Sequence, residues 1–273
     1  MVAATPTGDA LIRLLEDIGA NAWPAARVER LHGWRLGYDR GVTRRANSVL
    51  PNRWTGGVDP DTAIDQVERR YRARGLTPCL KLTRAAEPAG LDDILARRGY
   101  RREGVSQVLT ADAPAVSEVR RSIAAVDLRD TPSDDWIAAS WPAPAAPDQI
   151  AARCAIVGRI RPPRAFALAT RDGDPAGAAL AVLEAGWAGI TAVHTLPRFR
   201  RTGIARALVA ALAAWALARR APSLYLQVEA DNRPARRLYA GAGFRPAYRY
   251  HYRTLPPPDR SRGEPAPRRP WPV

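Results

Sequence analysis

The sequence predicts a mixed α/β (α+β) fold, with a mostly antiparallel sheet flanked by helices. Short apolar runs bounded by Gly, Pro and Asp turn signals predict strands. Longer segments with apolar residues at helical spacing predict helices. In the C-terminal half, three strands are followed by helix, strand, helix and strand, the order of a mixed sheet with helices packed on it. The chain has 273 residues, enough for one large domain or two small ones.

The N-terminal half is predicted to alternate between helices and strands. Ala63, Ile64, Val67 and Tyr71 lie close to the i, i+3, i+4, i+7 spacing of an amphipathic helix, which we expect over Asp61–Ala73. The other elements expected here are helices near Asp9–Ala22 and Gly90–Arg98 and strands over Gly33–Tyr38, Thr43–Leu50, Thr77–Thr83 and Arg102–Leu109.

The C-terminal half gives a clearer pattern. Turn signals at Asp172–Pro175 and Ala185-Gly186 separate three apolar runs. The prolines of Ser140–Asp148 predict a loop. The expected elements are strands over Ala165–Thr170, Ala176–Leu183, Trp187–Thr195, Ser223–Val228 and Ala247–Arg253, a long helix over Thr202–Arg219 and a short helix over Arg233–Ala240.

A weak internal repeat links the two halves. The run ILARRGYRREGVSQVLT, which ends at Thr110, parallels LYAGAGFRPAYRYHYRT, which ends at Thr254. Each run reads as a short helix, a Gly-aromatic turn and a strand, and a helix and a strand precede each one. This pattern favours a tandem duplication, with chance similarity as the alternative.

Composition limits the classes of function. The formal net charge is +15, but Lys81 is the only lysine, so arginine supplies 41 of the 42 basic side chains. This skew indicates a coding bias more than selection for phosphate contacts, and we do not expect nucleic acid as the main partner. No apolar run reaches the ~18 residues of a membrane span, and the start lacks an export signal, so we expect a cytoplasmic protein with no membrane partner.

Metal and disulfide sites are not expected. Cys79 and Cys154 are the only cysteines, and they lie far apart without a C-x-x-C spacing. His32 and His251 have no partners at ligand spacing.

The strongest local signal is the segment TLPRFRRTGIA, residues 195–205, where a strand is expected to run into a helix. Gly203 lets a ligand approach the backbone closely. The N–H groups and dipole of the following helix suit a pyrophosphate. Arg198, Arg200 and Arg201 add forked donors for phosphate oxygens.

This segment resembles the acetyl-CoA pyrophosphate loop of the GNAT acetyltransferases, whose pattern is Q/R-x-x-G-x-G/A. Arg200, Gly203 and Ala205 fill the three signature positions. A second stretch of the chain is similar to the family's N-x-x-A-x-x-L-Y-x-x-x-G-F pattern. The matching residues are Asn232, Ala235, Leu238, Tyr239, Gly243 and Phe244. The resemblance is strong over residues 190–250 and extends back to about residue 126.

The resemblance implies a GNAT fold and direct transfer of an acetyl group from acetyl-CoA, a cosubstrate, to an amine, without a metal. It implies a cofactor site between the strands at Trp187–Thr195 and Ser223–Val228, with backbone N–H groups near Val193–Thr195 facing the oxyanion. Asn232 has two open roles, as a ligand of the pantetheine arm or as a helix cap. The expected cofactor-binding residues are Val193, Thr195, Arg200, Arg201, Thr202, Gly203, Ile204, Ala205, Asn232 and Tyr239.

Tyr239 occupies the position of the family's general acid, which protonates the departing thiolate. The general base is open. Trp187 stands where many members have a carboxylate, which leaves Glu184, His194, Glu229 or a water-mediated route as candidates.

We therefore expect two GNAT-like domains, a degenerate copy at residues 1–112 and a catalytic copy at 126–255, followed by a disordered Pro/Arg-rich tail at 256–273. The first copy lacks an R-x-x-G-x-A loop and is not expected to bind acetyl-CoA. The acceptor is a small-molecule or protein amine of unspecified identity, and a homodimer is left open. The alternative function is a non-catalytic module that senses acyl-CoA or binds a partner.

Overall fold

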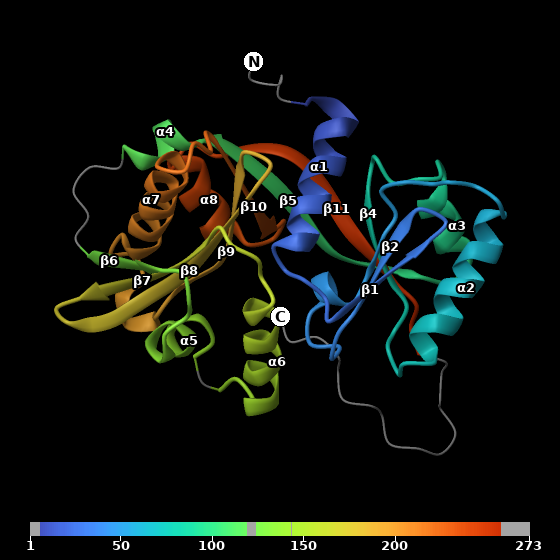
Figure 1. Ribbon diagram of the computed structural model, residues 1–273, viewed down its shortest axis with the longest axis horizontal. Helices are drawn as coiled ribbons and strands as arrows, with labels where there is room; N and C mark the ends of the chain where they lie inside the picture. The colour runs from blue at the N-terminus through green and yellow to red at the C-terminus, as the bar shows by residue number, and fades with distance from the viewer. Residues whose placement is uncertain (1–5, 119–123, 143, 258–273) are drawn as a thin grey trace. The chain divides into compact units, whose positions relative to one another are not determined.

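The computed structural model describes residues 6–118, 124–142 and 144–257 (Figure 1). Most of the tail expected to be disordered, residues 258–273, lies outside this part of the chain. The chain divides into two compact units. Unit 1 contains the chain up to Val105 and the segment from Arg249 onward, and unit 2 contains Ser106–Tyr248.

Unit 1 is a small sheet with helices on it. Its strands are ordered β1-β2-β3-β4-β11, antiparallel except for the parallel pair β3 and β4. Its elements are α1 (Gly8–Asn21), β1 (Arg27–Leu31), β2 (Trp34–Tyr38), β3 (Val49–Leu50), α2 (Pro60–Arg72), β4 (Cys79–Thr83) and α3 (Leu91–Arg97), with parts of β5 (Arg101–Asp112) and β11 (Arg245–Thr254).

Local sequence explains the best-defined helix of unit 1. Asp59 caps α2 by accepting a hydrogen bond from the backbone N–H of Thr62 at 2.9 Å, and Pro60 takes the first helical position. The apolar stripe of α2, with Ile64 and Val67 fully buried, packs into the core of the unit.

Unit 2 carries a larger sheet in the order β5-β10-β9-β8-β7-β6. Its strands are antiparallel except for the parallel pair β9 and β10. Its elements are α4 (Ala113–Ser117), β6 (Ala125–Arg129), α5 (Asp134–Ser140), α6 (Pro147–Gly158), β7 (Arg164–Arg171), β8 (Asp174–Glu184), β9 (Trp187–Thr195), α7 (Ile204–Leu217), β10 (Ser223–Glu229) and α8 (Arg233–Gly241).

The core of unit 2 shows which faces of the strands are covered. Leu224, Leu226 and Val228 of β10 share one hydrophobic core with the buried face of α7 and with Tyr239 of α8. Because side chains alternate along a strand, Tyr225, Gln227 and Glu229 belong to the opposite face.

The boundaries between the two compact units fall inside two strands, β5 and β11. Residues Ser106–Asp112 of β5 pair with β10, so the strand that ends the first repeat completes the sheet of unit 2. Residues Tyr250–Thr254 of β11 pair with β4, so the last strand of the chain completes the sheet of unit 1. The expected domains are continuous segments of the sequence. In the structure, the end of β5 belongs to unit 2 and the end of β11 belongs to unit 1.

One expected strand is mostly a loop. Within Thr43–Leu50, Arg44–Ala46 form a 3-10 turn and only β3 is extended. The side-chain amide of Asn47 explains this, since its oxygen accepts the backbone N–H groups of Asp39 and Gly41 and its nitrogen donates to the carbonyl of Thr43. These local bonds compete with a ladder. Elements that the sequence analysis missed are β1, α4, β6, α5 and α6.

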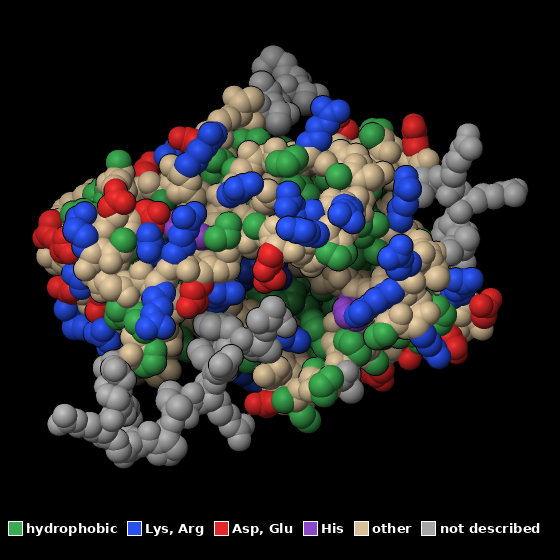
Figure 2. All heavy atoms as spheres, turned by 180° about the vertical axis from the view of Figure 1, so that it is seen from behind, with side chains coloured by type: hydrophobic (Ala, Val, Ile, Leu, Met, Phe, Trp, Pro, Cys, Tyr) green, Lys and Arg blue, Asp and Glu red, His purple; other side chains and the backbone are tan. Residues whose placement is uncertain are grey.

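The described residues contain no helix long and apolar enough to cross a membrane. Basic side chains are spread over the face shown in Figure 2 and are interspersed with acidic ones.

Candidate functional site

The parallel strands β9 and β10 separate partway along their length. They pair over four residues each, up to Ile190 of β9 and Leu226 of β10. The first four residues of β9 are buried, and the five from Thr191 to Thr195 are only half-buried. The sheet of unit 2 therefore opens between the carboxyl ends of its two parallel strands.

A β-bulge lies in β9 where the strands separate. Ala178 pairs with His194 and Leu180 with Thr191, so two residues of β9 stand opposite Ala179. Ala192 has a positive φ of 52°, which is uncommon for a non-glycine residue. The indole nitrogen of Trp136 donates to the carbonyl of Ala179 at 2.9 Å and supplies a partner at the disrupted ladder. The bulge turns backbone groups of β9 out of the ordinary strand pattern.

The segment after β9 forms a tight turn into α7. A 3-10 turn at Pro197–Phe199 is closed by the hydroxyl of Thr202, which donates to the carbonyl of Phe199 at 2.7 Å. Arg201 and Gly203 both have left-handed backbones, with φ of 63° and 89°. Such alternation points successive N–H groups toward one place, and the first turn of α7 adds N–H groups without intrahelical partners. This backbone arrangement is of the kind that suits an anion.

The three arginines of this loop differ in surroundings. Arg198 is engaged elsewhere, since its guanidinium lies 3.1 Å from Asp174 and over the ring of Phe199. Arg200 and Arg201 are exposed and form no ion pair with described residues. These two remain available for a polyanionic ligand.

Tyr239 lies in the core of unit 2 with 7% of its surface exposed. Its ring meets that of Phe244 edge-on at 5.9 Å between centroids. Its hydroxyl makes no hydrogen bond with any described residue, and burial raises the pKa of Tyr239 to about 12. The hydroxyl therefore stays protonated at physiological pH.

Asn232 caps α8. Its side-chain oxygen accepts the backbone N–H of Ala235 at 3.1 Å. This geometry is the cap that the sequence analysis weighed against ligand binding, and it leaves the exposed amide nitrogen for other contacts.

The three candidate bases lie at different places in unit 2. Glu184 pairs with Trp187 at the hairpin end of β8 and β9, at the opposite end of β9 from Thr195. His194 lies beyond the bulge, its Nε2 is buried without a hydrogen-bond partner, and burial and then Arg200 lower its pKa. Glu229 is exposed at the carboxyl end of β10.

Two glycines of the site escaped the sequence analysis. A Cβ on Gly177 would lie 2.5 Å from the carbonyl oxygen of His194, and a Cβ on Gly189 would clash with the hydroxyl of Tyr225. Isolated glycines inside expected strands are the signal that could have revealed these close approaches.

The described part of the chain contains no group of three or more His, Cys, Asp or Glu side chains placed to hold a metal ion. Unit 2 carries backbone N–H donors and exposed arginines at the turn before α7, a buried phenol on α8, an imidazole near the end of β9 and an exposed carboxylate at the end of β10. They suit binding of a polyanion and acid–base chemistry.

Comparison with known sequences gives a consistent result. The sequence matches the family described as "Probable histone acetyltransferase Rv0428c C-terminal" over residues 9–253. The protein described as "Uncharacterized N-acetyltransferase YobR" from Bacillus subtilis (strain 168) is 28% identical over 247 residues, which cover 89% of this chain and 98% of that protein.

Solved structures show the same fold. A GCN5-related N-acetyltransferase from Kribbella flavida matches with a TM-score of 0.67 and 20% identity, covering 92% of this chain and 96% of that one. A tandem GNAT protein from the clavulanic acid biosynthesis pathway matches with a TM-score of 0.63 and 14% identity, covering 94% and 90%. The prediction of a tandem GNAT fold is confirmed. Because the family match spans most of the chain, this protein belongs to that acetyltransferase family and is a GNAT N-acetyltransferase.

Proposed function

We propose that unit 2 transfers an acetyl group from acetyl-CoA directly to an amine. The observation that carries this proposal is the continuity of three features along β9. The strand leaves β10 after Ile190, bulges at Ala192 and ends in the turn that opens α7 at Gly203. In an extended acyl-CoA, the thioester, the pantetheine arm and the pyrophosphate follow one another in that order. The gap between β9 and β10 would hold the thioester, the bulged part of β9 would meet the pantetheine arm, and the turn before α7 would bind the pyrophosphate.

The pyrophosphate is bound by the backbone N–H groups from Arg201 to Ala205 and by the guanidinium groups of Arg200 and Arg201. The N–H groups of Val193 and Thr195 follow the bulge, where they can meet the pantetheine arm and the oxyanion of the tetrahedral intermediate. The separated ends of β9 and β10 would then lie on either side of the thioester.

Tyr239 acts on the leaving thiolate. Because the pKa of Tyr239 is about 12, complete proton transfer to a thiolate whose conjugate acid has a pKa of about 8.5 would cost about 5 kcal/mol if the two groups lay in separate environments. The apolar surroundings that raise the pKa of the phenol also raise the pKa of the thiol, because both charged forms are desolvated. The difference between the two pKa values is therefore smaller in the site. Tyr239 therefore donates a hydrogen bond to the sulfur as negative charge develops, and the proton follows.

Glu229 is the base that we propose. It lies on the face of β10 opposite the core that holds Tyr239, so an acceptor amine and the leaving sulfur would lie on different sides of the thioester. As an exposed carboxylate it can act through a water molecule. His194 is the competing candidate, whereas Glu184 lies at the wrong end of β9 for this arrangement.

The first test is isothermal titration of the purified protein with acetyl-CoA, followed by thiol release with a panel of amines. Gly203→Glu should abolish binding, because it adds a side chain and a negative charge where the pyrophosphate binds. Gly173→Glu is the matched control, since Gly173 also has a left-handed backbone, with φ of 86°, but lies in the turn between β7 and β8. Equal loss of affinity in both variants, or none in Gly203→Glu, would contradict the phosphate-loop assignment.

The acceptor panel should contain small amines and a lysine-bearing peptide. The chain suits a protein acceptor assay because its sole lysine, Lys81, is 7% exposed and lies 2.6 Å from Glu16 in an ion pair. Acetyl-lysine formed in the assay would therefore belong to the acceptor. Binding of acetyl-CoA without turnover on any amine would favour the non-catalytic alternative.

A further inference from the structure

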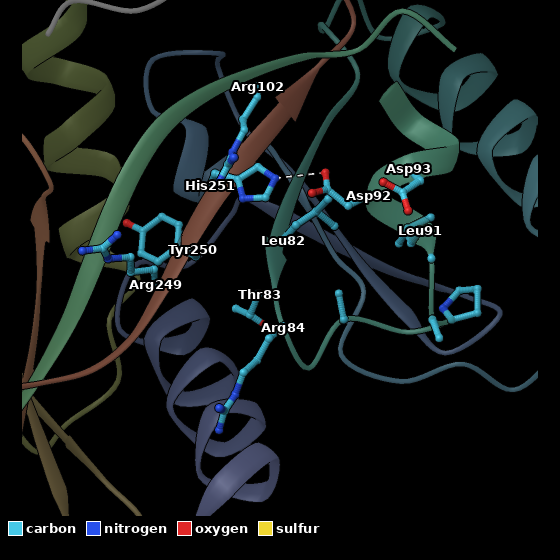
Figure 3. Close-up of a pocket in the computed structure, with 14 residues that line it drawn as sticks. Leu82, Thr83, Arg84, Leu91, Asp92, Asp93, Arg102, Arg249, Tyr250 and His251 are labelled. Carbon is cyan, nitrogen blue, oxygen red and sulfur yellow. Dashed lines mark hydrogen bonds and ion pairs between the residues drawn. The ribbon is translucent and has the colours of Figure 1, made fainter. Parts of the chain in front are cut away.

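A cavity of about 550 Å³ lies wholly within unit 1, and the proposed transfer reaction makes no use of it. Its walls come from the end of β4, the segment leading into α3, the first turn of α3, the start of β5 and from β11 (Figure 3). The volume falls in the range of small-molecule sites, which is roughly 300–1,000 Å³.

A fixed polar group forms part of the wall. Asp92 of α3 accepts hydrogen bonds from Nε2 of His251 at 3.0 Å and from Nε of Arg253 at 2.6 Å. Arg253 is held in turn by the carbonyl of Tyr100 at 3.1 Å. Burial alone would raise the pKa of Asp92, but these hydrogen bonds hold it below its ordinary value. Asp92 is thus ionised and already compensated, and it fixes the imidazole of His251, whose side chain is 12% exposed.

The remaining charge around the cavity is mainly positive. Arg84, Arg102 and Arg249 all line it. Arg102 and Arg249 form no ion pair with any described residue, and Arg84 pairs only with Asp9, in an exposed contact at 3.1 Å. Figure 3 shows Arg102 extending toward the ring of His251. Against these cations stands one further carboxylate, the exposed Asp93. A bound anion would offset this positive charge.

We propose that this cavity binds a small organic anion carrying a carboxylate or a phosphate. The forked guanidinium of Arg102 matches either group, and Nδ1 of His251 becomes a second donor when the imidazole takes up a proton. Leu82, Pro88 and Leu91 supply an apolar wall for the carbon part of the ligand. The site is distinct from the phosphate loop of unit 2, and its test is independent of acetyl-CoA.

Anion binding should be coupled to proton uptake by His251. Burial lowers the pKa of His251, and the charges of Arg102 and Arg253 lower it further, although the hydrogen bond and charge of Asp92 oppose them. Arg84, Arg249 and Asp93 line the same cavity. A bound anion offsets the cationic field and favours the imidazolium, so affinity should rise as pH falls through the pKa range of His251.

The experiment is isothermal titration of the full chain with inorganic phosphate, glycerol 3-phosphate and succinate at constant ionic strength. Saturable binding of glycerol 3-phosphate or succinate is expected. The ligand that binds more tightly shows whether the cavity prefers a phosphate or a carboxylate. Arg102→Gln should weaken it about tenfold, whereas Arg101→Gln, the adjacent exposed arginine outside the cavity, should stay within about twofold. Titrations in Tris and PIPES should reveal proton uptake, which His251→Gln removes.

Three outcomes would overturn the proposal. They are no saturable binding of any probe up to about 10 mM, equal weakening in Arg101→Gln and Arg102→Gln, or binding of inorganic phosphate alone without dependence on Arg102. Thermal melting confirms that the variants fold. Acetyl-CoA titration of Arg102→Gln should match that of the wild type, so a failure of the proposed transfer site would be seen separately.

Discussion

At the scale of single residues, the chemistry of unit 2 depends on how the fold treats a few polar groups. Tyr239 is buried without a hydrogen-bond partner among the described residues, so its proton is free to serve a ligand. Asn232 caps α8 through its side-chain oxygen. The imidazole of His194 is desolvated, which favours its neutral form. These differences, which the residue types alone do not show, decide which group can act as acid, base or scaffold.

Replacement of Tyr239 by Phe tests the acid. Loss of the hydroxyl should lower kcat by about 10²-fold or more, as general acids typically contribute, while the affinity for acetyl-CoA changes little. Steady-state kinetics with a thiol-release readout, combined with titration of acetyl-CoA, separates the two quantities. A kcat that matches the wild type would assign Tyr239 to packing against Phe244.

A pair of variants can show whether Glu229 or His194 is the general base. Glu229→Gln should lower kcat by at least about tenfold near neutral pH, and the loss should shrink at high pH, where the amine is already deprotonated. His194→Gln should retain most of the activity. The opposite result in the two pH–rate profiles would make His194 the base.

At the scale of elements, the site depends on the fit between β8, β9 and the start of α7. Gly177 makes this fit possible, since a Cβ there would lie 2.5 Å from the carbonyl oxygen of His194 and 2.9 Å from Cγ2 of Ile204. The bulged strand β9 and the first residue of α7 therefore both pack against the backbone of Gly177. The shape of β9 therefore helps to position the turn that leads into α7.

Gly177→Ala should lower the free energy of unfolding by about 1–3 kcal/mol through overpacking, and it should weaken acetyl-CoA binding. Gly158→Ala is the control, because Gly158 ends α6 with no atom within 4 Å of an added Cβ. It should be neutral or stabilising by up to about 1 kcal/mol. Chemical denaturation and titration measure both effects, and normal stability of Gly177→Ala would contradict the close approach.

At the scale of the whole molecule, buried tyrosines link stability to alkaline pH. Burial raises the pKa of Tyr239 to about 12, and it raises the pKa values of Tyr71 and Tyr252 well above the ordinary value. The folded protein holds these protons more tightly than the unfolded chain, where tyrosine titrates near ~10. The stability from each group is complete below the unfolded pKa and is lost as pH rises toward the folded pKa.

The free energy of unfolding should therefore decline steeply between about pH 10 and pH 12, with Tyr239 alone contributing on the order of 3 kcal/mol. Denaturant titrations across this range, with tyrosinate absorbance as a second readout, measure the decline. Tyr239→Phe should show a shallower slope than the wild type, whatever its stability at neutral pH. Identical slopes would argue against a raised pKa for this residue.

The sequence by itself determined the elements with strong periodic or motif signals. The helix at Asp61–Ala73 and the strand at Trp187–Thr195 were predicted close to their observed bounds, since hydrophobic spacing and turn residues act locally. The phosphate loop and the position of Tyr239 followed from motif spacing, and the GNAT family match agrees with that resemblance. Their roles stay predictions.

Only the tertiary structure decided how the strands are shared and where the sheet opens. The repeat in the sequence is linear, yet β5 and β11 each complete the other unit's sheet, because strand pairing joins segments that are remote along the chain. The bulge at Ala192 depends on the pairing of β9 with β8, which a single sequence does not reveal. The cavity around His251 likewise joins β11 to α3, over 150 residues apart in sequence, so no local pattern could predict it.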